Sequence, residues 1–203
     1  MQVELFEKDL SPEALDYFSG RARIGVDTET SGLDPRNCKL ALVQVSDESG
    51  DRVAVVHNPS RDSPLLKELL AIEPPWKVFH NARFDLGFLA WHLGVRITNP
   101  RCTKILARYV EPAEKAHLQW VAQRYLGIAL DKGPVRLTFV ENPNAPVTEE
   151  VLQYAARDAA VLIPLISQLE ARASPQQLSS ARGAWAALPQ QVLQDLQGPL
   201  RSR

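Results

Sequence analysis

The chain has 203 residues, of which 45% are hydrophobic and 23% charged, and its formal net charge is −1. This composition is typical of a globular protein with one sizeable core, so we expect a single domain with a small appendage. It excludes a strongly basic protein that binds phosphates through its overall charge. Any nucleic acid would therefore have to bind through a local patch.

The sequence shows no sign of a targeting segment or of a zinc-binding pattern. The N-terminal stretch MQVELFEKDL is acidic and amphipathic, so we expect no signal peptide. There is no run of 18 apolar residues, so we expect no membrane span and a cytoplasmic protein. Cys38 and Cys102 belong to no CxxC or Cys/His pattern, which favours two reduced thiols over a zinc site or a disulfide framework.

Strand and loop patterns dominate the first half. Residues 22–28 (ARIGVDT) form an apolar run that ends in polar side chains, which is typical of a buried strand. After a loop rich in Gly, Asp, Pro and Asn, residues 39–46 and 52–57 are β-branched runs around a turn and predict a hairpin. Residues 64–72 predict a helix that begins with proline, and residues 76–80 (WKVFH) a short strand.

Helical patterns dominate the second half. The stretch NARFDLGFLAWHLG predicts a helix with Asn81 as its N-cap and Gly94 as its stop. A proline-rich segment, 128–147, is expected to be loosely ordered, and a long helix should begin near Thr148, with Pro164 kinking or dividing it. Further helices are expected at 103–110, 116–126 and, in short patches, 181–187 and 189–196. This order of elements predicts an α/β domain with a mixed sheet.

Acidic residues occur at three places where they suggest chemistry. Asp27 and Glu29 are two apart at a strand end, so their side chains point to the same face. Asp85 lies in an otherwise apolar helix, and Tyr154 and Asp158 are four apart on a helix, about one turn from each other. Clustered carboxylates need compensating positive charge, and hard divalent cations with oxygen ligands are suitable. Each place taken alone could equally be a solvated acid or a chance pairing.

The three places in this order resemble the DEDD superfamily of 3′→5′ exonucleases, in its tyrosine-containing DEDDy subgroup. The matching stretches are VDTETSGLD (26–34), HNARFDLGFL (80–89) and YAARD (154–158). Within the superfamily the chain is similar to the ribonuclease D type of catalytic domain, over roughly residues 22–170. The DEDDh subgroup has a histidine five residues before the last aspartate, where this chain has Gln153.

The resemblance implies a ribonuclease H-like fold, with a mixed five-stranded sheet flanked by helices. It implies an exonuclease domain over residues 1–172, followed by a short helical or partly disordered extension over 173–203. We expect no counterpart of the C-terminal helical domain of full ribonuclease D. Cys102-Thr103 stands where that type usually has Asp-Thr, and the usual Ser-Asp-Trp after Lys132 is missing.

The resemblance also implies a mechanism with two divalent ions, Mg²⁺ or Mn²⁺. Asp27 would bridge both ions, Glu29 and Asp158 would complete the first, and Asp85 would support the second. Tyr154 would orient the attacking water. The substrate would be single-stranded nucleic acid with a free 3′ end, and the product a nucleoside 5′-monophosphate.

Several neighbouring residues are candidates for contacts with the substrate. The expected contacts to the terminal nucleotide come from Thr28, Thr30, Leu33, Asn81 and Phe84. Leu33 could instead anchor its loop, and Asn81 could act only as a helix cap. His80 is expected to be a packed histidine at a strand end rather than a catalytic group. The basic residues that could contact phosphates are Lys104, Arg108, Lys132 and Arg136.

Two alternatives to the exonuclease stay open. One is a non-catalytic nucleic-acid-binding module that keeps the fold, although all five site positions are filled here. The other is a phosphodiesterase that acts on short oligonucleotides, which would differ in the length of substrate that its surface holds. No residue distinguishes RNA from DNA, because that choice depends on contacts to the 2′-hydroxyl.

Overall fold

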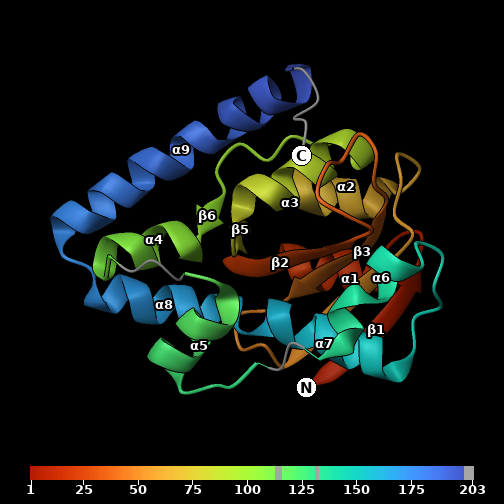
Figure 1. Cartoon of the computed structure of the whole chain (residues 1–203), viewed down its shortest axis with the longest axis horizontal. Coiled ribbons are helices and arrows are strands. Elements are labelled where there is room, and N and C mark those ends of the chain that lie inside the picture. Colours follow the sequence, from red (N-terminus) through yellow and green to blue (C-terminus); the bar gives the residue numbers. More distant parts are fainter. Residues whose placement is uncertain (113–115, 131–132, 199–203) are drawn as a thin grey trace.

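Figure 1 shows a computed structural model of the chain, which describes residues 1–112, 116–130 and 133–198, except for the side chain of Arg136. A mixed sheet with the strand order β1-β4-β3-β2-β5-β6 forms the centre. Only β3 runs antiparallel to its neighbours among these strands. The strands are β1 (Gln2–Glu7), β2 (Arg23–Thr30), β3 (Leu40–Ser46), β4 (Arg52–His57), β5 (Trp76–Phe79) and β6 (Arg101–Cys102).

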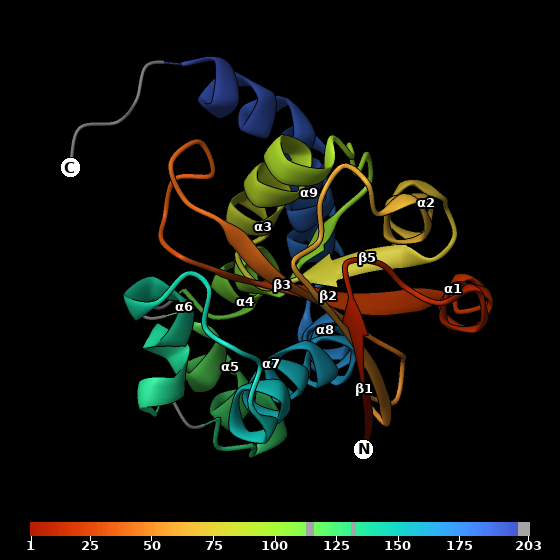
Figure 2. The same ribbon diagram turned by 90° about the vertical axis from the view of Figure 1, so that its right-hand side faces the viewer.

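Helices cover both faces of this sheet. Figure 2 shows α3 and α9 above the sheet and α7 and α8 below it. The helices before residue 112 are α1 (Pro12–Ser19), α2 (Pro64–Ala71), α3 (Ala82–Phe88), the π-helical turn η1 (Leu89–Leu93) and α4 (Thr103–Val110). The later helices are α5 (Leu118–Leu126), the 3₁₀ turn η2 (Pro134–Leu137), α6 (Thr138–Glu141), α7 (Glu149–Ala160), α8 (Leu162–Arg172) and α9 (Pro175–Gln197).

The period of two in the strands divides the core between the two faces. Val43 and Val45 of β3 belong to the larger apolar cluster, which includes residues of α1, α2 and α3. Leu42, which precedes Val43 and points to the opposite face, belongs to a second cluster with Ala155 and Ala156 of α7. Both faces of β3 are buried, which explains why its sequence is a continuous apolar run rather than an alternating one.

The mixed α/β architecture predicted from the sequence is confirmed, but the sheet has six strands instead of five. The sequence patterns did not predict the two edge strands, β1 and β6. Strand β1 pairs in parallel with β4 over its whole length, from Gln2 opposite Arg52 to Glu7 opposite His57. Because its side chains are only partly buried, its sequence does not show the apolar run of an inner strand. Strand β2 also continues two residues further than predicted, to Thr30.

The helices before residue 173 depart from the predictions in three places. Asn81 occupies the N-cap position of α3 but in the left-handed conformation, with φ 68°, and its side chain makes no capping hydrogen bond. The long helix is divided, as expected, but at Val161, so that Pro164 lies in the first turn of α8, where a missing N–H is tolerated. The segment 128–147 contains two short helical turns, η2 and α6.

The last helix, α9, is one continuous helix of 23 residues rather than two short patches. A capping box opens it, in which Ser174 and Gln177 exchange side-chain to backbone hydrogen bonds. The helix packs on α3 and α4, and the buried Trp185 donates its indole N–H to the carbonyl of Cys102 in β6 at 3.1 Å. The division of the chain at residue 172 stays a prediction.

None of the helices in the described part of the chain combines the length and the apolar character needed to cross a membrane.

Candidate active site

The C-terminal half of β2 carries the first two predicted site residues, Asp27 and Glu29. The face of β2 that carries these two acids can be identified from Gly25. A Cβ added to Gly25 would lie 2.6 Å from the carbonyl oxygen of Ala159 in α7. Residues 25, 27 and 29 alternate with their neighbours and therefore face α7. The strand register shifts between Glu29 and Thr30, directly after the two acids.

Helix α7 brings the third acid and the tyrosine to this face. Thr148 caps the helix by accepting a hydrogen bond from the backbone N–H of Val151 at 3.3 Å. The alanines Ala155, Ala156 and Ala159 are fully buried, so the helix backbone approaches the sheet closely. Asp158 is buried with 8% of its surface exposed, and Tyr154, one turn earlier, is half-buried.

The fourth acid comes from the opposite side of the sheet. Asp85 lies in the first turn of α3 and is 2% exposed. The hydroxyl of Thr28 donates a hydrogen bond of 2.7 Å to its carboxylate. Thr28 alternates with Asp27 and Glu29 and so points to the α3 side. One face of β2 thus carries two of the acids, and its other face carries the threonine that orients Asp85.

The site is electrostatically strained because its carboxylates, two of them buried and two half-buried, lie near one another. Burial, and then the neighbouring carboxylates, raise the pKa of Asp27 well above its ordinary value. Burial together with the charges of Asp158 and Asp85 raises the pKa of Glu29 to about 8. Burial raises the pKa of Asp85 to about 7, and the hydrogen bond from Thr28 opposes that rise. The groups repel one another, so ionising them together requires compensating positive charge.

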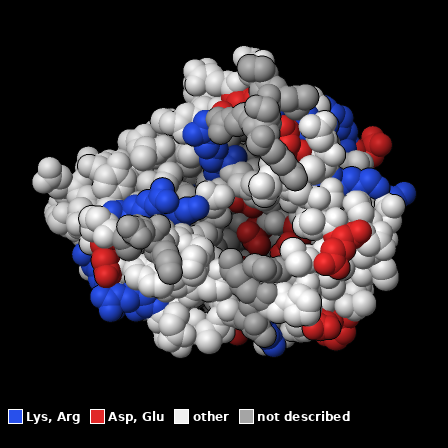
Figure 3. Space-filling model, in the orientation of Figure 1, with Lys and Arg blue, Asp and Glu red and all other residues white. Residues whose placement is uncertain are grey.

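The surface of the molecule is hollowed at its centre, as Figure 3 shows, with acidic side chains on the floor. Four carboxylates that influence one another's ionisation offer the oxygen ligands that Mg²⁺ and Mn²⁺ prefer. Within the described ranges, no group of three or more His, Cys, Asp or Glu side chains already has the arrangement of a formed metal site. The donor chemistry fits divalent cations, and binding would require the carboxylates to rotate toward one another.

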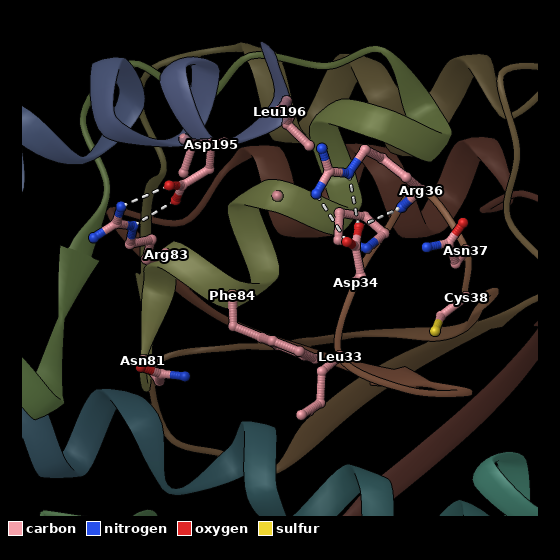
Figure 4. A pocket seen from close by; sticks show the side chains of 13 residues that line it. Leu33, Asp34, Arg36, Asn37, Cys38, Asn81, Arg83, Phe84, Asp195 and Leu196 are labelled. Carbon is pink, nitrogen blue, oxygen red and sulfur yellow. Dashed lines mark hydrogen bonds and ion pairs between the residues drawn. The ribbon is translucent and has the colours of Figure 1, made fainter. Parts of the chain in front are cut away.

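The predicted substrate contacts lie around the same strand end. The hydroxyl of Thr30 donates to the carbonyl of Gly32 at 2.7 Å and so shapes the loop after β2. Leu33 in that loop is 75% exposed, and Figure 4 shows its side chain directed toward that of Phe84 from α3. Asn81 accepts a hydrogen bond from Lys104 at 3.2 Å. Of the predicted contacts, Leu33, Asn81 and Phe84 line one cavity, whereas Thr28 and Thr30 are not among the residues that line it.

The remaining candidates are His80 and the basic residues Arg108, Lys132 and Arg136. His80 donates from Nε2 to the carbonyl of Ala116 at 2.9 Å, and its Nδ1 is hydrogen-bonded to the hydroxyl of Thr103 at 2.7 Å. It is therefore a packed histidine, as expected. Arg108 is exposed on α4. Lys132 and the side chain of Arg136 lie outside the described residues.

A cavity of about 620 Å³ adjoins the opening between the loop after β2, helix α3 and helix α9. Two arginines in it were not anticipated from the sequence: Arg83 pairs with Asp195 of α9 at 2.7 Å, and Arg36 with Asp34 at 2.8 Å (Figure 4). Arg83 directly precedes Phe84 in the second acidic stretch, but only the fold brings it to α9. The cavity is lined by residues 33–38, Asn81, Arg83, Phe84, Gly87, Val192, Asp195 and Leu196.

A family model described as 3′-5′ exonuclease matches residues 6–173 of the chain. The chain belongs to this 3′-5′ exonuclease family. The resemblance to the ribonuclease D type of DEDD exonuclease domain is thereby confirmed, and the matched range includes all five predicted catalytic positions.

Proteins similar to this exonuclease-family chain differ in length. A ribonuclease D from Haemophilus influenzae is 30% identical over 160 residues, which are 78% of this chain but 39% of that protein. The chain therefore spans less than half of that relative. NrnC from Brucella melitensis matches end to end: its structure bound to pGG has a TM-score of 0.87 at 27% identity, covering 100% of this chain and 97% of that one. The structure of the same protein with bound Mg²⁺ has a TM-score of 0.86 at 26% identity, covering 100% and 98%.

Proposed function

We propose that the protein is a two-metal-ion 3′→5′ exonuclease, which hydrolyses phosphodiester bonds at the 3′ end of single-stranded nucleic acid and releases nucleoside 5′-monophosphates. The observation that carries this proposal is the gathering of four carboxylates from β2, α3 and α7, of which the two on β2 are half-buried and the other two buried. The raised pKa values of Asp27, Glu29 and Asp85 are typical of a functional site, and bound cations would favour the ionised form of these groups. Family membership supports the same reaction.

Each side chain then has a distinct task. When bound, divalent cations would neutralise the charge on the attacking and leaving oxygens of the phosphodiester. Asp27 would hold both cations, Glu29 and Asp158 the first, and Asp85 the second. Thr28 keeps one oxygen of Asp85 engaged at 2.7 Å and so limits how that carboxylate can turn. Tyr154, one helical turn from Asp158, would orient the attacking water through its hydroxyl.

The terminal nucleotide would enter between the loop after β2 and helix α3. Leu33 is highly exposed for an apolar residue and faces Phe84, so the pair offers an apolar surface to a base. Asn81 and the backbone around Thr28 and Thr30 would contact the sugar and phosphate. A protein with net charge −1 must hold the substrate through such local contacts and through the bound cations.

The first test is a cleavage assay on 5′-labelled single-stranded DNA and RNA of one sequence. We expect a ladder that shortens from the 3′ end with Mg²⁺ or Mn²⁺ and no products with chelator. The Asp27→Asn variant should be inactive, while Asp16→Asn, which removes an exposed acid of α1, should cleave like the wild type. The polymer that is cleaved faster identifies the substrate class.

The binding-module alternative is tested with the same proteins. If the folded wild type gives no ladder with either metal but retains the labelled strand in a gel shift, the exonuclease proposal is wrong and the binding module is favoured. A cytoplasmic location stays a prediction from the sequence.

A second function, a phosphodiesterase of short oligonucleotides, is favoured by the cavity beside the opening. Helix α9 forms one side of it, and the Arg83–Asp195 pair ties α9 to the active-site helix α3. A cavity bounded in this way holds a short substrate more readily than a long one. The similar NrnC structure bound to pGG is consistent with such a substrate. Comparing kcat/KM for a 5′-phosphorylated dinucleotide and for a 20-mer separates the two: a strong preference for the dinucleotide supports the second function.

A further inference from the structure

Gln44, in the middle of β3, is a buried amide with no bonding partner. Its exposed fraction is 0%, and neither Nε2 nor Oε1 makes a hydrogen bond to any of the described residues. It is the one buried side chain in that part of the chain whose donor and acceptor are both unpaired. Buried polar groups are nearly always hydrogen-bonded, because losing water without a replacement is costly. The position therefore needs an explanation.

The register of the sheet places Gln44 next to the carboxylates. It is paired directly with Asp27 across the β2–β3 ladder. Directly opposed residues of antiparallel strands project to the same face, with Cβ atoms about 4.5–5.5 Å apart. Leu42, two residues earlier on the same face, packs in the cluster with Ala155 and Ala156 of α7. Gln44 therefore lies under α7, beside Asp27.

The other neighbours of Gln44 give its amide no hydrogen-bond partner. On the β4 side its paired residue is Val55, which is fully buried and apolar. Ser46, the next residue on this face, shows what an ordinary structural polar group does here: its hydroxyl donates to the carbonyl of Ala159 at 2.8 Å. Gln44 lies under the same helix without such a bond, so the polar group at its side is the carboxylate of Asp27.

We infer that Gln44 is a positioning residue for Asp27, whose carboxylate accepts a hydrogen bond from Nε2 when it is ionised and holds cations. An amide suits this task because it donates without carrying charge. A lysine or arginine there would neutralise Asp27 and compete with the cations, whereas a hydroxyl would be too short to reach across the ladder. Groups that hydrogen-bond metal ligands typically contribute 10- to 100-fold to metal affinity or activity. This inference rests on the proposed function.

The test compares Gln44→Met with the matched control Ser46→Ala. Methionine has the length of glutamine but cannot donate a hydrogen bond. Ser46→Ala removes a neighbouring polar group that has a structural partner, the carbonyl of Ala159. Mg²⁺ alone is titrated into each metal-free protein by calorimetry, Tm is measured with chelator, and kcat and KM are measured on a labelled oligonucleotide.

For Gln44→Met we expect an unchanged or higher metal-free Tm, since the unpaired amide is removed. Its affinity for Mg²⁺ should fall on the order of 10- to 100-fold, and kcat should fall while KM is unchanged. For Ser46→Ala the metal-free Tm should fall and the affinity for Mg²⁺ should stay as in the wild type.

Wild-type affinity and kcat in Gln44→Met, beside an active wild type, would overturn this inference and leave the proposed function intact. A lower metal-free Tm with unchanged Mg²⁺ affinity would also overturn it, because it would show a purely structural role. A wild type that neither binds Mg²⁺ nor cleaves would overturn both proposals together.

Discussion

The repulsion among the carboxylates predicts an unusual dependence of stability on pH. Glu29 has its pKa raised from 4.5 to about 8 in the folded protein. Between these pH values the folded state keeps a proton that the unfolded state has released, so the free energy of unfolding falls as pH rises. The metal-free protein should therefore become less stable between about pH 5 and pH 8, the range in which many proteins are most stable.

The magnitude follows from the same pKa. A rise of this size in one pKa, at about 1.4 kcal/mol per pH unit, corresponds to about 5 kcal/mol. Asp85 contributes in the same direction, but its repulsion of Glu29 is already part of that figure, so the two do not add fully. For a chain of this length a loss of about 5 kcal/mol lowers Tm by about 10–20 °C.

The assay is thermal unfolding from pH 5 to pH 9 with chelator, for the wild type and Glu29→Gln. Glutamine cannot ionise, so the variant should lose the part of the dependence that Glu29 contributes, while Asp27 and Asp85 keep theirs, and it should be more stable than the wild type at pH 8. His92 acts in the opposite direction, because burial lowers its pKa and favours stability at higher pH, but it is present in both proteins and cancels in the difference. Added Mg²⁺ at pH 8 should raise the Tm of the wild type far more than that of Glu29→Gln.

A wild-type Tm that stays constant or rises from pH 5 to pH 8, with the same profile in Glu29→Gln, would refute this reasoning. It would show that Glu29 is solvated well enough to ionise at its ordinary pKa. The argument for bound cations from electrostatic strain would then fail as well.

Three further predictions concern the framework of the site. Gly25→Ala places a Cβ 2.4 Å from a serine hydroxyl and should cost about 1–3 kcal/mol in urea unfolding. As a control, Gly183→Ala at an exposed position of α9, where an added Cβ has nothing within 4 Å, should stabilise by up to about 1 kcal/mol. Thr28→Val removes the hydrogen bond that favours ionised Asp85, so the acidic limb of the pH–activity profile should move to higher pH; an unmoved limb would contradict this. Trp185→Ala should lower the free energy of unfolding by about 3–5 kcal/mol, and a loss under 1 kcal/mol would show that α9 is not held by this side chain.

The sequence could predict which of the proposed catalytic residues share a face, because local rules determine how they are presented. Period two places Asp27 and Glu29 on one face, and a spacing of four places Tyr154 and Asp158 on one side of a helix. Their order along the chain then pointed to the family. By contrast, the hydrogen bond between Thr28 and Asp85 joins residues 57 apart and depends on how α3 crosses the end of β2.

The missed elements are those whose stability comes from distant partners. Strand β1 is a half-exposed edge strand that forms by pairing with β4, about 50 residues later. Helix α9 lacks a clear apolar stripe, and it was expected in two patches. Its start was nevertheless readable, because Ser174, Pro175 and Gln177 form the serine–proline–glutamine pattern of a capped helix.

The bond from Trp185 to Cys102 has a consequence for how copies of the protein behave in concentrated solution. An edge strand with free carbonyl groups can pair with a strand of another molecule and start aggregation. At this edge β6 is only two residues long, α9 packs against it, and the indole of Trp185 occupies the carbonyl of Cys102. Helix α9 thus protects one border of the sheet from extension by a second molecule, in addition to bounding the cavity beside the active site.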